Sequence, residues 1–303
     1  MSPPAIAIIG RNGQIAEALV RSAAREGVAA VAAGRPEIDL ADRDSLVSFF
    51  DRVRPQAVIN AAAYTAVDQA EKERDTAFAV NAEGPGHLAR LTAAAGIPLV
   101  HISTDYVFDG GKPTPYVEDD PVAPLGVYGA SKAAGEEAIR TANPKHLILR
   151  TSWVFSADGA NFVKTMLRLG QVREDLGVVA DQAGCPTYAG DFADTVLGLV
   201  ARLPAGSADP RWGTYHLTNR GSTTWHDFAE EIFQQAKSAG LKTPRLKAIT
   251  TADYPTPARR PANSILDNGK VERVFGVTRR DWREGLRECV TALTESMQDG
   301  GRA

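Results

Sequence analysis

Tyr128 and Lys132 are the residues whose types and spacing most directly indicate chemistry in this chain. They are four positions apart, so on a helix they lie on one face, about one turn apart. A free tyrosine has a pKa of about 10, and an ammonium group one turn away favours the phenolate and lowers that pKa. Such a pair can give a proton to a carbonyl oxygen that is becoming an alkoxide. The spacing alone is common, so its interpretation depends on the surrounding elements.

The elements that must position this pair form a regular series. Short apolar runs, which predict buried strands, alternate with stretches at helical spacing. This order predicts an α/β fold, a Rossmann-like doubly wound parallel sheet with helices on both faces. The predicted strands are 5–9, 28–33, 57–62, 99–103 and 146–150, and the predicted helices are 15–25, 45–53, 75–95 (bent at its Gly-Pro-Gly), 161–170 and 224–239.

A glycine-containing loop joins the first predicted strand to the first predicted helix. Glycines there permit a tight turn, and the helix N-terminus offers free N–H groups to a pyrophosphate. The spacing is G-x-x-G-x-x-A, with Ala16 small enough for the helix to pack on the strand, and a plain turn is the alternative. The predicted cofactor-binding residues of this loop are Gly10, Arg11, Asn12, Gly13, Gln14 and Ile15.

The end of the second predicted strand bears on the choice of cofactor. An acidic residue there binds the ribose 2′-hydroxyl of NAD, whereas an arginine accepts the 2′-phosphate of NADP. Arg35 therefore favours NADPH, with NADH still possible, unless the residue is only a solvated surface charge. Asp39, followed by Leu40, either accepts a hydrogen bond from the adenine amino group or caps a turn.

Small and polar residues end the next two strands, at the edge of the sheet where ligands of such folds bind. Ala62, Ala63 and Tyr64 leave room for the cofactor, although small residues also serve tight packing. Thr104 and Asp105 place oxygen atoms in the same crevice, although they are also good turn residues.

Two further regions are candidates for contacts with the substrate. Trp153, just after the fifth strand, either stacks on a sugar or base or belongs to the core. Arg259 and Arg260 lie in the proline-rich segment 254–261, which must be extended, and they either clamp a diphosphate or remain solvated. We expect residues 1–152 to form an NAD(P)-binding domain, to which the chain returns around 190–217, and residues 153–303 to form mainly a smaller substrate-binding lobe.

Composition narrows the function further. A net charge of −3 without a long basic run argues against a nucleic-acid partner. No apolar run is long enough to span a bilayer, and the start lacks the features of a signal peptide. Two cysteines, Cys185 and Cys289, favour a reduced cytoplasm, and the five scattered histidines do not show the spacing of a zinc site.

With these residues in place, the chain resembles the dTDP-4-dehydrorhamnose reductases, which belong to the extended short-chain dehydrogenases. The resemblance covers nearly the whole length. Stretches 223–226 and 254–261 distinguish this family from sugar epimerases of the same fold. Besides the glycine loop, the matching stretches are 60–68, 103–108, 128–132, 150–154, 161–167, 181–187, 223–226 and 254–261.

The resemblance implies that NAD(P)H reduces the C4 keto group of dTDP-4-dehydro-L-rhamnose to give dTDP-L-rhamnose, a step of polysaccharide biosynthesis. It implies that Tyr128 donates the proton and that Lys132 binds the nicotinamide ribose and lowers the tyrosine pKa. It also implies that Thr104 hydrogen-bonds the reacting oxygen, while Asp105 and Trp153 contact the nucleotide sugar. This agrees with the chemistry expected of one acid and one hydroxyl donor beside a forming alkoxide.

One departure concerns magnesium. In some members of the family, three glutamates bind a magnesium ion between two subunits. The matching positions here are Ala18, Gly190 and Arg283, none of which is an oxygen ligand, so the sequence argues against magnesium and leaves a monomer or a homodimer open. The rival interpretations are another nucleotide-sugar reductase or epimerase of the same fold, and a non-catalytic NAD(P)-binding regulatory subunit.

Overall fold

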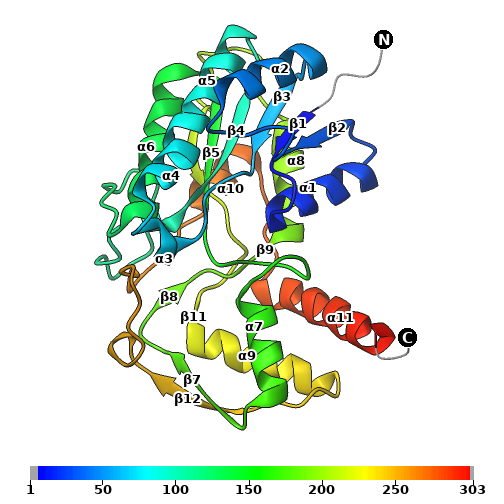
Figure 1. Ribbon diagram of the computed structural model, residues 1–303, viewed down its shortest axis with the longest axis vertical. Helices are drawn as coiled ribbons and strands as arrows, with labels where there is room; N and C mark the ends of the chain where they lie inside the picture. Colours follow the sequence, from blue (N-terminus) through cyan, green and yellow to red (C-terminus); the bar gives the residue numbers. More distant parts are fainter. Residues whose placement is uncertain (1–5, 301–303) are drawn as a thin grey trace.

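The computed structural model describes residues 6–300, with side chains up to residue 295, so the ends of the two expected lobes, 1–5 and 301–303, lie outside it. The chain forms a larger lobe around a central sheet and a smaller lobe beside it (Figure 1). All six strands of the central sheet are parallel, in the order β10-β5-β4-β3-β1-β2. They are β1 (Ile6–Ile9), β2 (Ala30–Ala33), β3 (Ala57–Asn60), β4 (Leu99–Thr104), β5 (His146–Thr151) and β10 (Gly213–His216).

Helices cover both faces of this sheet, which confirms the predicted doubly wound fold. Alternate residues of β1 belong to the two cores on opposite faces of the sheet. Ile8 is in one core with Leu19 and Phe192, whereas Ala7 and Ile9 are in the other. The order reverses between β1 and β3, so the loops that follow these strands diverge and leave a crevice. The flanking helices are α1 (Gln14–Arg25), α8 (Ala189–Val200) and α10 (Gly269–Phe275) on one face, and α2 (Arg43–Val53), α5 (Gly84–Ala94) and α6 (Val127–Ala142) on the other.

The helix predicted over 75–95 is built in three pieces. Residues Arg74–Phe78 form α4, Ala79–Glu83 form a π-helical turn, and α5 begins at Gly84 with Pro85 in its first turn. A Cβ atom on Gly84 would lie 2.7 Å from the carbonyl oxygen of Leu40, so only glycine permits this close contact. The short helices α3 (Val67–Ala70) and η2 (Asp105–Val107) follow β3 and β4.

The smaller lobe has its own core of aromatic and aliphatic side chains around Phe228 and Trp282. Both are fully buried, with ring centroids 5.2 Å apart. Its helices are α7 (Phe162–Val172), α9 (Trp225–Ser238) and α11 (Trp282–Gly300). Its short strands are β6 (Val154–Phe155), β7 (Asp175–Val179), β8 (Ala183–Gly184), β9 (Thr187–Tyr188), β11 (Thr223–Thr224) and β12 (Arg245–Ile249), with η3 (Thr251–Asp253) after the last.

Candidate active site

A cavity of about 500 Å³ lies where the carboxyl ends of the central strands face the smaller lobe. The sheet edge, α6 and the loop after β6 all contribute to its wall. It brings together predicted residues from five separate parts of the chain, from the glycine loop to Trp153. The predicted residues on the wall are Asn12, Gly13, Gln14, Ile15, Ala63, Thr104, Asp105, Tyr128, Lys132 and Trp153.

Tyr128 and Lys132 lie on the first turns of α6, one turn apart. Gly129 allows this helix to approach η2, because a Cβ atom there would lie 2.1 Å from the carbonyl oxygen of Tyr106. Lys132 is buried, and its Nζ donates a hydrogen bond of 2.7 Å to the carbonyl oxygen of Ile102. Burial lowers the pKa of Lys132 to about 8, against an opposing effect of the Glu136 carboxylate.

The expected lowering of the Tyr128 pKa is wrong for this structure. Part of the side chain is accessible from the cavity, but its hydroxyl is surrounded by protein, and this burial raises the pKa of Tyr128 to about 12. The hydrogen bond with Thr104 acts in the opposite direction, and the charge of Asp105 adds to the rise. Lys132 is not among these causes. Tyr128 is therefore a phenol throughout the neutral range.

Thr104 and Asp105 connect β4 to this tyrosine. Thr104 Oγ1 donates to Asp105 Oδ1 over 3.0 Å and accepts from the N–H of Tyr106 over 3.2 Å. Burial raises the pKa of Asp105 to about 6, although hydrogen bonds from Ser264 and Thr104 lower it. The Tyr106 ring meets the Tyr128 ring edge to face, with centroids 5.5 Å apart, which fixes the orientation of the phenol.

Trp153 extends the site toward the smaller lobe. Its backbone has a φ of 47°, which is unusual for a residue other than glycine. Its indole stacks on Trp225 with centroids 3.5 Å apart and lies directly over Gly184, where any Cβ atom would collide with the ring. The indole is packed, as the core interpretation expects, and the residue also lines the cavity, so its contact with a ligand stays a prediction.

The glycine loop has the shape that a dinucleotide needs. Gly10 has a φ of 128°, and a Cβ atom there would lie 3.2 Å from the backbone of Ala61, so the loop passes tightly over β3. Gly13 caps α1 without a side-chain hydrogen bond, so the first N–H groups of this helix remain available to a phosphate. These residues fit the pyrophosphate of NAD(P).

Several predicted residues lie outside the wall of this cavity. Arg35 is exposed after β2, and Arg11 packs against Gly34 beside it; neither forms an ion pair with another residue in the described part of the chain. Asp39 Oδ1 accepts from the N–H of Ala41 over 2.9 Å, so it caps its own turn. The other predicted residues outside the wall are Gly10, Leu40, Ala62, Tyr64 and Arg260. Leu40 is buried, and the hydroxyl of Tyr64 donates to Glu73.

Arg260, outside the wall, is held by a residue from a distant part of the sequence. Its Nη2 donates to Asp68 Oδ2 over 3.0 Å, while its Nη1 is buried and finds no hydrogen-bond acceptor among the described residues. Arg259 is exposed. The two neighbouring arginines are thus not equivalent, since Arg260 is half-buried and has a buried donor atom without an acceptor, whereas Arg259 is exposed.

The sequence interpretation missed His101 and Asn60, which lie behind Lys132. His101 is fully buried on β4, with its Nε2 3.0 Å from Lys132 Nζ. Asn60 Nδ2 lies 3.0 Å from His101 Nδ1. The available signal was a polar residue inside an otherwise apolar strand, which buried strands rarely carry without a partner.

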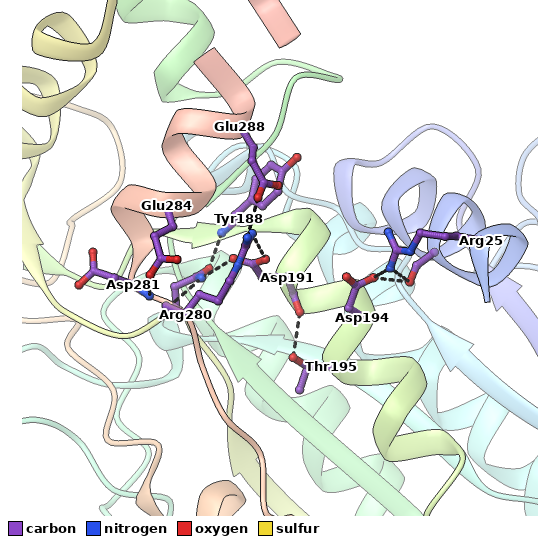
Figure 2. A network of polar contacts seen from close by, with 11 residues as sticks. Arg25, Tyr188, Asp191, Asp194, Thr195, Arg280, Asp281, Glu284 and Glu288 are labelled. Carbon is purple, nitrogen blue, oxygen red and sulfur yellow. Dashed lines mark hydrogen bonds and ion pairs between the residues drawn. The ribbon is translucent and has the colours of Figure 1, made fainter. Parts of the chain in front are cut away.

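A second cavity, of about 510 Å³, includes Ala18 and Gly190, two of the three positions that match the magnesium-binding glutamates of some family members, but not Arg283. Its carboxylates are already paired with arginines (Figure 2). Arg280 bridges Asp191 and Glu288, with 2.6 Å between its Nη1 and Glu288 Oε1, and Arg25 pairs with Asp194. Residues whose negative charge is neutralised in this way do not fit a divalent cation.

Comparison with known proteins places the chain in a well-populated family. The family model described as "RmlD substrate binding domain" matches residues 4–295. A dTDP-4-dehydrorhamnose reductase from Sinorhizobium fredii is 47% identical over 288 residues, covering 95% of this chain and 97% of the relative.

Two solved structures agree with this relationship. The dTDP-4-dehydrorhamnose reductase of Clostridium acetobutylicum superposes with a TM-score of 0.89 and 38% identity, over 95% of this chain and 99% of that one. The enzyme of Bacillus anthracis, solved in complex with NADP, has a TM-score of 0.88 and 37% identity over the same shares. Within residues 6–300, no helix combines the length and apolar content that crossing a membrane requires.

Proposed function

Since the chain belongs to the dTDP-4-dehydrorhamnose reductase family, we propose that it reduces the C4 keto group of dTDP-4-dehydro-L-rhamnose with NADPH or NADH. The observation that carries this proposal is the meeting of Tyr128, Thr104 and Lys132 on the wall of one cavity with the glycine loop. We propose that the larger lobe, which includes β10, binds the cofactor. The smaller lobe is proposed to bind the sugar nucleotide.

The dinucleotide would be held by the glycine loop, with Arg11 and Arg35 near the 2′-phosphate of NADPH and Lys132 at the nicotinamide ribose. When bound, the reduced nicotinamide supplies the hydride. As negative charge develops on the C4 oxygen, Tyr128 would give it the phenolic proton. Thr104 would turn its hydroxyl proton from Asp105 to this oxygen and donate a hydrogen bond to it. The raised pKa of Tyr128 suits this direction, because the residue must be protonated before each turnover.

The nucleotide sugar is proposed to contact Asp105 and Trp153, with Arg260 donating to its diphosphate from the segment 254–261. A charge-assisted hydrogen bond to phosphate would satisfy the buried Nη1 of Arg260. Two buried, unpaired cysteines, Cys185 and Cys289, are compatible with a reducing cytoplasm. The protein is proposed to act as a monomer or as a homodimer without a bridging magnesium ion.

A direct assay tests the function. Purified protein should oxidise NADPH when dTDP-4-dehydro-L-rhamnose is supplied and should not do so without it, and the product should be dTDP-L-rhamnose. The matched arm uses the corresponding UDP-linked keto sugar. If no nucleotide sugar is reduced while the protein binds NADPH, the reductase proposal is wrong and the regulatory-subunit alternative is favoured.

A further inference from the structure

The loop that follows β6 in the smaller lobe, residues 156–161, lies against the first turn of α1 in the larger lobe. Gln14, the first residue of α1, lines the active-site cavity together with Gly159 and Ala160 of this loop. Asn161 Nδ2 donates a hydrogen bond of 2.9 Å to Gln14 Oε1. The helix that offers its N-terminus to the cofactor is thus joined to the other lobe through a side chain.

The backbone fixes the direction of this hydrogen bond. Asn161 is the N-cap of α7, and its Oδ1 accepts from the N–H of Lys164 over 3.0 Å. Its Nδ2 donates to the carbonyl oxygen of Ser156 over 2.7 Å. A backbone N–H only donates and a carbonyl oxygen only accepts, so the remaining hydrogen of the Asn161 amide is left for Gln14, which must present its oxygen. One defined bond therefore links the first turns of α1 and α7.

Other contacts hold the loop close to α1 around this bond. Gly159 has a φ of 65°, and a Cβ atom there would lie only 3.1 Å from Gln14 Cγ, so the two segments are tightly packed. Arg21, two turns after Gln14 on the same face of α1, pairs with Asp158 over 2.5 Å. Both charged side chains of that pair are partly exposed, so it contributes little on its own. The partly buried bond between Gln14 and Asn161 is the main link.

Aromatic contacts continue this link from α7 toward the proposed nucleotide-sugar contacts. Phe162, the first residue of α7, packs against Trp225 with ring centroids 4.6 Å apart. Trp225 stacks on Trp153, with centroids 3.5 Å apart. Trp153 lines the cavity and is proposed to contact the nucleotide sugar. A continuous series of contacts therefore joins the glycine loop to that tryptophan.

We propose that Gln14 is a positioning residue through which NAD(P)H at the glycine loop and the nucleotide sugar in the smaller lobe bind cooperatively. The inference rests on the proposed function of the two lobes. The backbone of Gln14 belongs to the turn that offers N–H groups to a phosphate, whereas its side chain contacts the smaller lobe. A cofactor that orders this turn also orders residues 156–161 and the start of α7. Less conformational entropy is then lost when the nucleotide sugar binds.

Calorimetric titration of dTDP, with and without saturating NADP⁺, tests this cooperativity with a pair of ligands that cannot react. NADP⁺ should lower the Kd for dTDP about fivefold or more in the native protein. Gln14→Met keeps the length of the side chain but has no acceptor oxygen, and should reduce this factor to about one. Gln14→Glu keeps an acceptor and should retain the factor, although its charge weakens the binding of NADP⁺ itself. A native factor of one, or an unchanged factor in Gln14→Met, would overturn the proposal.

Variants of the other lobe separate the link from the stability of the loop. Asn161→Ser keeps a good N-cap for α7 but is too short to reach Gln14, so it should abolish the factor as Gln14→Met does. The double variant should lower the factor no further, because both changes remove the same bond. Lys164→Met is the matched control, since Lys164 Nζ donates to the carbonyl oxygen of Ala157 over 3.0 Å without contacting α1. An equal loss in this control would contradict the role of Gln14.

Hydrogen exchange of α7 provides a readout that needs no nucleotide sugar. NADP⁺ should slow amide exchange at the start of α7 in the native protein but not in Gln14→Met. If this result holds while dTDP does not bind and no keto sugar is reduced, the proposed function fails and the link through Gln14 stands. If the protein reduces the keto sugar but neither α7 exchange nor the dTDP factor responds to Gln14→Met, the function stands and the inference is wrong.

Discussion

Arg260 and Asp68 are 192 residues apart in the sequence, and their guanidinium and carboxylate groups lie 3.0 Å apart. Asp68 also accepts from the N–H of Ala258 over 3.1 Å, so one carboxylate fastens the segment 254–261 to the start of α3. Burial acts to raise the pKa of Asp68, but the Ala258 N–H and Arg260 together hold it below its usual value. This contact orients the guanidinium and leaves Nη1 without an acceptor among the described residues.

The first prediction concerns this arginine. Arg260→Ala should raise KM for the nucleotide sugar about tenfold with a smaller effect on kcat, which corresponds to the loss of one charge-assisted hydrogen bond. Arg259→Ala, at the exposed neighbouring position, is the matched control and should change KM much less. Steady-state kinetics over a range of substrate concentrations separate the two. Equal effects of both substitutions would mean that the diphosphate is not bound by Arg260 in particular.

The second prediction concerns the proton donor. Tyr128→Phe should fold normally and bind NADPH, but lose on the order of 10²–10⁴ in turnover, which is the usual contribution of a positioned acid. Tyr106→Phe is the control, since its ring meets Tyr128 edge to face within the same cavity. Its loss should be far smaller. A near-normal rate for Tyr128→Phe would refute the assignment of the donor.

The third prediction concerns cofactor choice. Arg35 is exposed and has no ionic partner among the described residues, so its charge is available to a 2′-phosphate. NADPH should be used at least as well as NADH, and Arg35→Asp should lower kcat/KM for NADPH more than for NADH. The two cofactors serve as each other's control in one preparation. An equal fall for both would show that Arg35 does not recognise the phosphate.

The fourth prediction concerns metal removal. Because Arg280 neutralises Asp191 and Glu288, and Arg25 neutralises Asp194, EDTA should leave both the steady-state rate and the molecular mass unchanged (Figure 2). Rate assays and light scattering, each with and without EDTA, check the two readouts. Loss of activity that magnesium alone restores would show that the acidic groups of this cavity bind the ion after all.

The fifth prediction concerns the buried ion pair beneath the site. Glu136 and Arg150 are both buried and form two hydrogen bonds, of 2.9 and 2.7 Å. Glu136→Gln should lower the free energy of unfolding by about 3–5 kcal/mol, because it leaves a buried guanidinium without its counter-charge. Glu137→Gln, at the exposed next position, should change it by less than about 1 kcal/mol. Urea denaturation measures both values.

The pH dependence of this pair has a definite sign. Burial alone would raise the pKa of Glu136, but Arg150, Ser103 and Arg140 together hold it below its usual value. A carboxyl group with a lowered folded-state pKa stabilises the fold above its unfolded pKa, about 4.3, and this contribution is lost as the pH falls through the folded pKa. The native protein and Glu136→Gln should therefore converge in stability below about pH 4. A gap that stays constant as the pH falls further below 4 would contradict this account.

Local signals in the sequence determined much of the architecture. The alternation of apolar runs and helical spacing predicted five strands of the parallel sheet, and the four-residue spacing placed Tyr128 and Lys132 on one face of α6. The glycine loop could be placed because glycine is needed wherever φ is positive or the backbone passes closely, as at Gly10. These are short-range properties, and each is visible within about fifteen residues.

Only the tertiary structure decided the electrostatics of the site. The charge of Lys132 was expected to lower the pKa of Tyr128, but burial dominates and raises it. The contacts that set this balance join β4, β3 and α6, as His101, Asn60 and Lys132 show. The tie between Asp68 and Arg260 likewise spans almost two thirds of the chain. The desolvation of a group depends on all the atoms that pack around it. These atoms surround the group only when distant segments of the chain have folded together.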